Sequence, residues 1–278
     1  MHKAERSASA PPPVDNTDWL KTVAIIFVSA GHFGFFFVDD DRWWSVLGRF
    51  AAPPFFFLMG YARSRTVPHY WIWVGVILTL LESWNAEWTW VAPNILLSFV
   101  LIRVARPYVQ RALEQYGWAA FALLVCAFVA AQPIAASLVD YGADGWLWAL
   151  FGACQRWFSD NRPVAKSAME AQALPPTHAT DVNWGLMRSA ACIAAAVFFV
   201  WQEQKEYSFQ GPHLTVFIVG LIVLCVCLCV FERGPSRFQS AEPIAGALRF
   251  IGRQTFEIYA LQLAGSELLV KLLPALAP

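Results

Sequence analysis

The sequence contains few charged residues for its length. Only 14% of its 278 residues are charged, whereas 58% are hydrophobic. A soluble domain would carry roughly 25% charged residues, so this shortage excludes an ordinary soluble protein and predicts an integral membrane protein with lipids as its surroundings. The formal net charge of zero says nothing about nucleic acid, and for a membrane protein we expect no nucleic-acid partner.

The six cysteines all fall within apolar stretches, where we expect no disulfides. Cys225, Cys227 and Cys229 alternate along the chain, so on a helix they point in different directions and cannot form one metal-binding face. We therefore expect small packing residues and no metal site.

The long hydrophobic runs predict an all-α, polytopic transmembrane bundle of about nine spans, since each crossing needs about 20 apolar residues. The third and sixth are short enough to be re-entrant. The predicted spans cover residues 18–38, 44–62, 69–82, 88–105, 117–138, 145–158, 184–202, 213–231 and 244–272.

Two polar segments lie outside this predicted transmembrane domain or interrupt it. Residues 1–17 are small, polar and Pro-rich, which predicts a flexible tail. No small-residue cleavage site follows a short apolar core, so we expect the first span to be retained rather than removed as a signal peptide. Residues 18–273 are predicted to form one transmembrane domain with a polar loop at 159–183.

The distribution of charge predicts the orientation. If the amino terminus is cytoplasmic, most Lys and Arg fall in the inner connections, and every outer loop within the chain carries acidic residues. Cytoplasmic loops collect Lys and Arg. We therefore expect a cytoplasmic amino terminus, a cytoplasmic 159–183 loop and an outer carboxyl terminus.

A polar stripe follows the first predicted span. Lys21 and His32 are eleven positions apart, which places them within about 20° of the same helix face and roughly 16 Å apart along the axis. Asp18 lies near that face, and Ser29 lies about one turn from His32. Charge inside hydrocarbon costs several kcal/mol and survives mainly where it has a partner or water, so this stripe predicts a functional site.

The second predicted span contains Arg49, which we expect at a depth similar to that of His32. A neutral imidazole can accept a proton from an attacking hydroxyl or amine, and a guanidinium can stabilise an oxyanion. The pair therefore predicts a small catalytic site for transfer of an acyl group. The alternatives are a packing role for His32 and a lipid-facing Arg49 that extends to the headgroups.

Several short motifs lie in or beside the predicted spans. They are Asp-Trp-Leu-Lys at 18–21, the Gly-His pair at 31–32, Gly-Arg-Phe-Ala at 48–51 followed by Pro-Phe-Phe-Phe at 54–57, Asn-Ile-Leu-Leu-Ser-Phe at 94–99 and Tyr-Gly-Ala-Asp-Gly at 141–145. Together these motifs resemble those of the TraX-type membrane acetyltransferases. The Lys21 to His32 spacing is also similar to that of the membrane acyltransferases that modify surface polysaccharides.

The resemblance implies a multi-pass protein of the bacterial cytoplasmic membrane. Acetyl-CoA would donate an acetyl group from the cytoplasmic side to a protein or glycan acceptor, with His32 as the base. A guanidinium group can bind a phosphate through two hydrogen bonds, so arginines at the inner ends of the spans could bind the coenzyme. The alternative explanation is that the positive-inside rule alone places these arginines there. The predicted coenzyme-binding residues are Lys21, Arg63, Arg65 and Arg253, with Arg103 and Arg106 at the same level.

Two positions depart from the family pattern. Where the family pattern has an aspartate before the histidine, this chain has Gly31. Where the pattern has a histidine after the tyrosine that corresponds to Tyr259, this chain has Gln262. Glu257 can supply a carboxylate or form an ion pair with Arg253 one helical turn away. These departures leave an alternative function, a structural or accessory subunit that contacts other subunits of a larger membrane complex. A transporter is not favoured, because the sequence shows no internal repeat.

Overall fold

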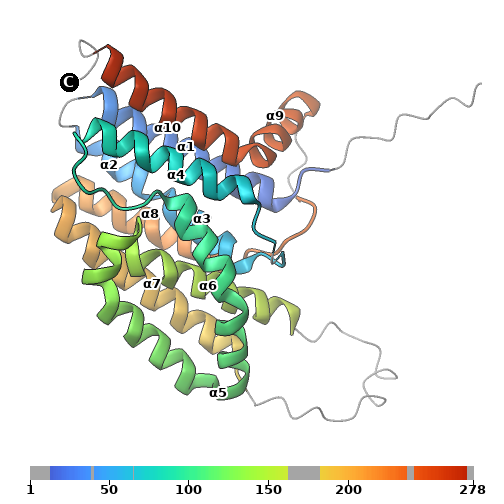
Figure 1. Ribbon diagram of the computed structural model, residues 1–278. Coiled ribbons are helices and arrows are strands. Elements are labelled where there is room, and N and C mark those ends of the chain that lie inside the picture. The colour runs from blue at the N-terminus through green and yellow to red at the C-terminus, as the bar shows by residue number, and fades with distance from the viewer. Residues whose placement is uncertain (1–12, 39–40, 65, 162–181, 237–240, 274–278) are drawn as a thin grey trace, which may run out of the picture.

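The computed structural model describes residues 13–38, 41–64, 66–161, 182–236 and 241–273. Within these residues the chain forms ten α-helices (Figure 1) and one isolated β-bridge. The helices are α1 (Asn16–Phe37), α2 (Arg42–Arg49), α3 (Ala52–Tyr61), α4 (His69–Asn85), α5 (Ile95–Leu138), α6 (Gly142–Asp160), α7 (Trp184–Tyr207), α8 (Gly211–Cys229), α9 (Glu242–Arg253) and α10 (Thr255–Leu272).

Among the described residues, four helices are long and apolar enough to cross a bilayer, namely α1, α5, α7 and α8. This agrees with the predicted all-α membrane protein. The count of nine spans and the cytoplasmic amino terminus stay predictions. Most of the expected 1–17 tail and of the 159–183 loop lies outside the described residues.

Two predicted spans are each broken into two helices. The 44–62 segment forms α2 and α3, which are separated at Phe50 and Ala51. Pro53 and Pro54 open α3, and because proline has no amide hydrogen, the α2 hydrogen-bond ladder cannot run on through them. The 244–272 segment forms α9 and α10, which are separated at Gln254. Neither of these two predicted spans is therefore one continuous helix.

The long helix α5 consists of two arms. Gly117 has φ 52° and ψ −126°, a backbone conformation that glycine adopts without steric cost, and it separates residues 95–116 from residues 118–138. The ends of the two arms that are far from Gly117 lie close together, as the hydrogen bond from the Asp140 amide to the Pro93 carbonyl at 3.0 Å shows. The arms therefore run antiparallel, as two successive spans would.

Helix α6 occupies the centre of the bundle. It packs against α3, α5 and α7, and nearly all of its side chains are buried. Aromatic side chains fill the contact, with the rings of Phe57 and Phe151 at 5.1 Å and those of Trp148 and Phe199 at 5.9 Å. Because lipid tails are as apolar as these side chains, close packing rather than hydrophobic burial holds such helices together in a membrane.

Helix α1 lies between two groups of helices. It packs against α2 on one side and against α9 and α10 on the other, and Figure 1 shows α1, α4 and α10 side by side. Residues 14–16 pair with residues 234–236, since the Asn16 amide donates to the Gly234 carbonyl at 3.0 Å. This pairing holds Arg233 beside Asp15, at 3.8 Å.

Candidate active site

A cavity of about 350 Å³ lies at the end of the bundle where α1 begins. We call it the basic cavity because six cationic side chains line it. They come from α1, α5, α6, α9 and the connections after α3 and α8. The six residues are Lys21, Arg63, Arg103, Arg156, Arg233 and Arg253.

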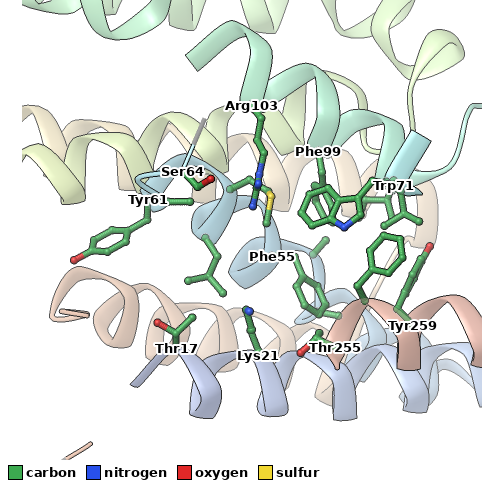
Figure 2. Close-up of a pocket in the computed structure, with 18 of the residues that line it drawn as sticks. Thr17, Lys21, Phe55, Tyr61, Ser64, Trp71, Phe99, Arg103, Thr255 and Tyr259 are labelled. Atoms are coloured by element: carbon green, nitrogen blue, oxygen red, sulfur yellow. The ribbon is translucent and has the colours of Figure 1, made fainter. Parts of the chain in front are cut away.

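The basic cavity has charged side chains on opposite walls and aromatic rings between them. Lys21 from α1 and Arg103 from α5 point into it from opposite sides (Figure 2). The Arg103 guanidinium donates to the Thr66 carbonyl at 2.7 Å and lies 4.4 Å from the centre of the Trp71 ring. Trp71 in turn stacks on Phe256 at 5.5 Å. Fixed cations beside flat rings suit a ligand that carries both phosphate and an aromatic base.

Three of the four predicted coenzyme-binding residues line this cavity, namely Lys21, Arg63 and Arg253. Arg65 lies outside the described residues. Arg103, also expected at this level, joins them, whereas Arg106 is not among the lining residues.

Two further cations at the basic cavity were not selected from the sequence. Arg156 comes from α6, where its Nε lies 2.5 Å from Asp160. Arg233 lies at the cavity because the following residues, 234–236, pair with the start of α1. Neither position carries a local signal, because both depend on contacts between distant segments.

A second cavity, of about 550 Å³, contains His32, and we call it the His32 cavity. Glu82, Asp140, Tyr259 and Glu267 are among its lining residues. Tyr259 also lines the basic cavity, so the two spaces share this side chain as a wall. Burial raises the pKa of the Asp140 carboxyl, in the connection between α5 and α6, to about 6.

The shared wall is held by a buried hydrogen-bond network. The Asn94 amide donates to the Tyr259 hydroxyl at 3.1 Å and to the Glu82 carboxylate at 3.0 Å. The Asn94 side-chain oxygen accepts from the Leu96 amide at 3.2 Å and so caps α5. One asparagine therefore joins the ends of α4, α5 and α10 at the level of the site.

His32 contacts α10 rather than α2. Its Nδ1 lies 3.0 Å from Gln262 Nε2, and its ring lies 5.9 Å from the Tyr259 ring and 6.2 Å from the Phe36 ring. The position of Gln262 was identified in the sequence only as a departure from the family pattern. Its contact with His32 joins residues 230 positions apart, and helix periodicity carries no information about such a contact.

Arg49 makes its contacts with α7 and with Tyr141 at the start of α6. Its guanidinium is 3.8 Å from the Glu203 carboxylate on α7, 4.8 Å from the Tyr207 ring centre and 5.9 Å from that of Tyr141. Arg49 lines neither cavity. Lys21 and His32 therefore line different cavities, while Arg49 contacts Glu203 and Tyr207 on α7 and Tyr141 at the start of α6.

Close packing of α1 and α2 explains the missing aspartate at position 31. A Cβ atom added to Gly31 would lie 2.7 Å from the Gly48 Cα, and one added to Gly48 would lie 2.8 Å from the Gly31 Cα. Such distances require backbone movement. The same contact brings His32 and Arg49, the next residues on each helix, to a similar depth, as the sequence predicted. A carboxylate to orient His32 cannot come from position 31 in this fold.

The apolar helices and the two adjoining cavities define a polytopic α-helical membrane protein with a polar site between its helices. A family model described as TraX protein matches residues 16–231, and the chain belongs to this family. No curated protein and no solved structure matched the chain. The matched residues include Lys21, His32 and Arg49 and end before Tyr259 and Gln262.

Proposed function

We propose that this protein is a membrane acyltransferase that moves an acetyl group from acetyl-CoA to a protein or glycan acceptor. The observation that carries the proposal is the shared wall at Tyr259. This side chain separates a basic cavity, suited to a nucleotide donor, from a cavity that contains the candidate base. Donor and acceptor would thus approach the same point from opposite ends of the bundle.

The basic cavity supplies the donor site. Its volume of about 350 Å³ is at the small end of the 300–1,000 Å³ range of ligand sites, so it would hold only part of the coenzyme. Lys21, Arg103 and Arg253 would bind phosphate oxygens. Arg63, whose side chain is 72% exposed, would bind phosphates at the surface.

The transfer step assigns the proton to His32. An acceptor hydroxyl or amine in the His32 cavity attacks the thioester carbonyl carbon, and the imidazole accepts the proton that the nucleophile loses. The new bond from oxygen or nitrogen to carbon forms as the carbon–sulfur bond breaks. Coenzyme A leaves as the thiolate, and the proton held by His32 returns to solvent or to that thiolate.

Arg49 would act at a distance from the reacting atoms. Because it lines neither cavity, we assign it a structural and electrostatic role through Glu203 in place of the oxyanion contact expected from the sequence. A cation at the level of His32 still favours the negative charge that develops on the thioester oxygen.

One observation favours the second candidate, a structural or accessory subunit. Large aromatic side chains are exposed on the helical surface, among them Phe35 at 77%, Trp73 at 68% and Trp90 at 74%. Such side chains suit contacts with other membrane subunits as well as with lipid.

The experiment that separates the two candidates uses purified protein and acetyl-CoA labelled in the acetyl group. We expect label transfer or coenzyme A release, and we expect His32→Ala to lower kcat by about 10²–10⁴-fold, because a general base contributes that much. His213→Ala is the matched control, since this half-buried histidine packs on Trp43 at 4.3 Å, away from both cavities. Absence of turnover in the isolated wild-type protein, together with turnover in a complex of subunits that His32→Ala leaves unchanged, would support the structural candidate.

A further inference from the structure

The imidazole of His32 ends a chain of polar contacts that begins at the backbone of α1. Ser29 Oγ lies 2.7 Å from the Ile25 carbonyl oxygen and 2.6 Å from Gln262 Oε1, and Gln262 Nε2 lies 3.0 Å from His32 Nδ1. Gln262 is thus the polar side chain that connects α10 to the candidate base.

The number of hydrogens available decides how this chain of contacts is arranged. A serine hydroxyl has one hydrogen, yet Ser29 faces two acceptor oxygens in this orientation of the amide. One of the two close oxygen–oxygen contacts then has no hydrogen and is repulsive. The Gln262 amide would also donate to Nδ1, so the hydrogen of the neutral ring sits on Nε2 and neither nitrogen can accept a proton.

A half-turn of the Gln262 amide removes both problems. The side-chain oxygen and nitrogen exchange places with little change in shape. His32 Nδ1–H then donates to Gln262 Oε1, Gln262 Nε2–H donates to Ser29 Oγ, and the Ser29 hydroxyl donates to the Ile25 carbonyl. Each of the three contacts has one hydrogen, and the lone pair on His32 Nε2 is free.

We propose that Gln262 is the positioning residue of His32: it holds the Nδ1–H tautomer and leaves Nε2 as the proton acceptor. This inference rests on the proposed acyl transfer. Gln262 supplies the orienting oxygen that a carboxylate at position 31 cannot supply, because Gly31 lies against Gly48. A neutral amide fixes the tautomer and ring direction without placing a second charge in the bundle.

The first test reads the tautomer directly. Nitrogen-15 NMR of full-length protein labelled at histidine distinguishes ring nitrogens with and without a hydrogen. The sequence has five histidines, so the His32 signals are assigned by their loss in His32→Gln. We expect a protonated Nδ1 and an unprotonated Nε2 at neutral pH. A protonated Nε2 would overturn the proposal, and this reading does not depend on turnover.

The second test compares substitutions at the same position. Gln262→Leu removes the orienting oxygen, so we expect a mixture of tautomers and a kcat lower by about tenfold or more with KM for acetyl-CoA unchanged, as misdirected reacting groups cost rate. Gln262→Glu keeps an acceptor for Nδ1–H and should retain the tautomer and the rate. Gln254→Leu, at the exposed junction of α9 and α10, is the control.

The outcomes separate this inference from the proposed function. Gln262→Leu with a wild-type tautomer and kcat would overturn the positioning role while leaving acyl transfer intact. Wild-type protein without transfer activity would overturn the proposed function, and the NMR result would still decide the hydrogen-bond arrangement. A folded Ser29→Ala variant provides a second readout, because it removes the partner of the Gln262 amide and should weaken the tautomer preference.

Discussion

Two neighbouring residues on α1, Gly31 and His32, show how single positions set the site. Gly31 allows the backbones of α1 and α2 to approach, and His32 turns away from that contact toward Tyr259 and Gln262. Small residues allow such close approach of membrane helices. The glycine therefore fixes the depth of the histidine and excludes a carboxylate beside it.

Gly31→Ala should destabilise the protein. The added Cβ would lie 2.7 Å from the Gly48 Cα, and overpacking of this kind costs about 1–3 kcal/mol. The measurement is the apparent unfolding temperature in detergent. Gly265→Ala is the matched control, since nothing lies within 4 Å of a Cβ built there. Equal melting of the two variants would show that α1 and α2 do not meet at Gly31.

Arg103→Gln should weaken binding of acetyl-CoA. Loss of one charge-assisted phosphate contact, worth about 1.5–3 kcal/mol, should raise KM about tenfold or more and leave kcat largely unchanged. Lys21→Gln should act in the same direction. Arg111→Gln is the control, because Arg111 is an exposed residue of the same helix and does not line the basic cavity. An unchanged KM in both cavity variants would exclude this cavity as the donor site.

At the level of elements, α2 is held between α1 and α8 and is tied to α7 through Arg49. Arg49 is 23% exposed and Glu203 only 5%, so the pair is largely removed from solvent. Removing one partner of such a pair leaves a charge without compensation. This tie connects α2 to α7, and it explains why Arg49 lines neither cavity.

Glu203→Gln should therefore lower the stability of the folded protein. Breaking a fully buried pair costs about 3–5 kcal/mol, and the partial exposure of Arg49 reduces our expectation to about 1–3 kcal/mol. Unfolding in detergent measures it, and Glu206→Gln, an exposed residue on the same helix, should change it less. If Arg49→Gln combined with Glu203→Gln costs as much as the two single changes added together, the pair is not coupled.

At the level of the whole molecule, charge is distributed unevenly between the two ends of the bundle. The basic cavity lies where α1 begins, and Glu82, Asp140 and Glu267 lie around the His32 cavity. By the positive-inside rule, we expect the basic end to lie in the cytoplasm. It would place the donor site on the cytoplasmic side and the acceptor site on the outer side.

Reporter fusions test this orientation. A fusion at residue 170, in the polar loop outside the described residues, should report a cytoplasmic location, whereas a fusion at Glu87, after α4, should report the outer side. The expectation follows from the Lys and Arg content of the inner connections. An outer location for residue 170 would reverse the assignment of donor and acceptor sides.

The sequence alone determined the class of the protein and much of the residue set. Low charge and long apolar runs established a helical membrane protein, and the motifs at 18–21, 31–32 and 48–51 pointed to the family whose model matches residues 16–231. The eleven-residue spacing placed Lys21 and His32 on one stripe of α1, and both residues line cavities beside α10.

Only the tertiary structure decided which side chains meet. The pattern of polar and apolar residues along a helix depends on which of its faces meet lipid or protein. It therefore shows which face is polar but not which neighbouring helix that face contacts. Gln262 contacts His32 although the two are 230 positions apart, and Arg49 pairs with Glu203 on α7. The contact of Gly31 with Gly48 leaves no room for the expected aspartate at position 31. These contacts depend on how the helices pack against one another. The periodicity of a single helix carries no information about that packing.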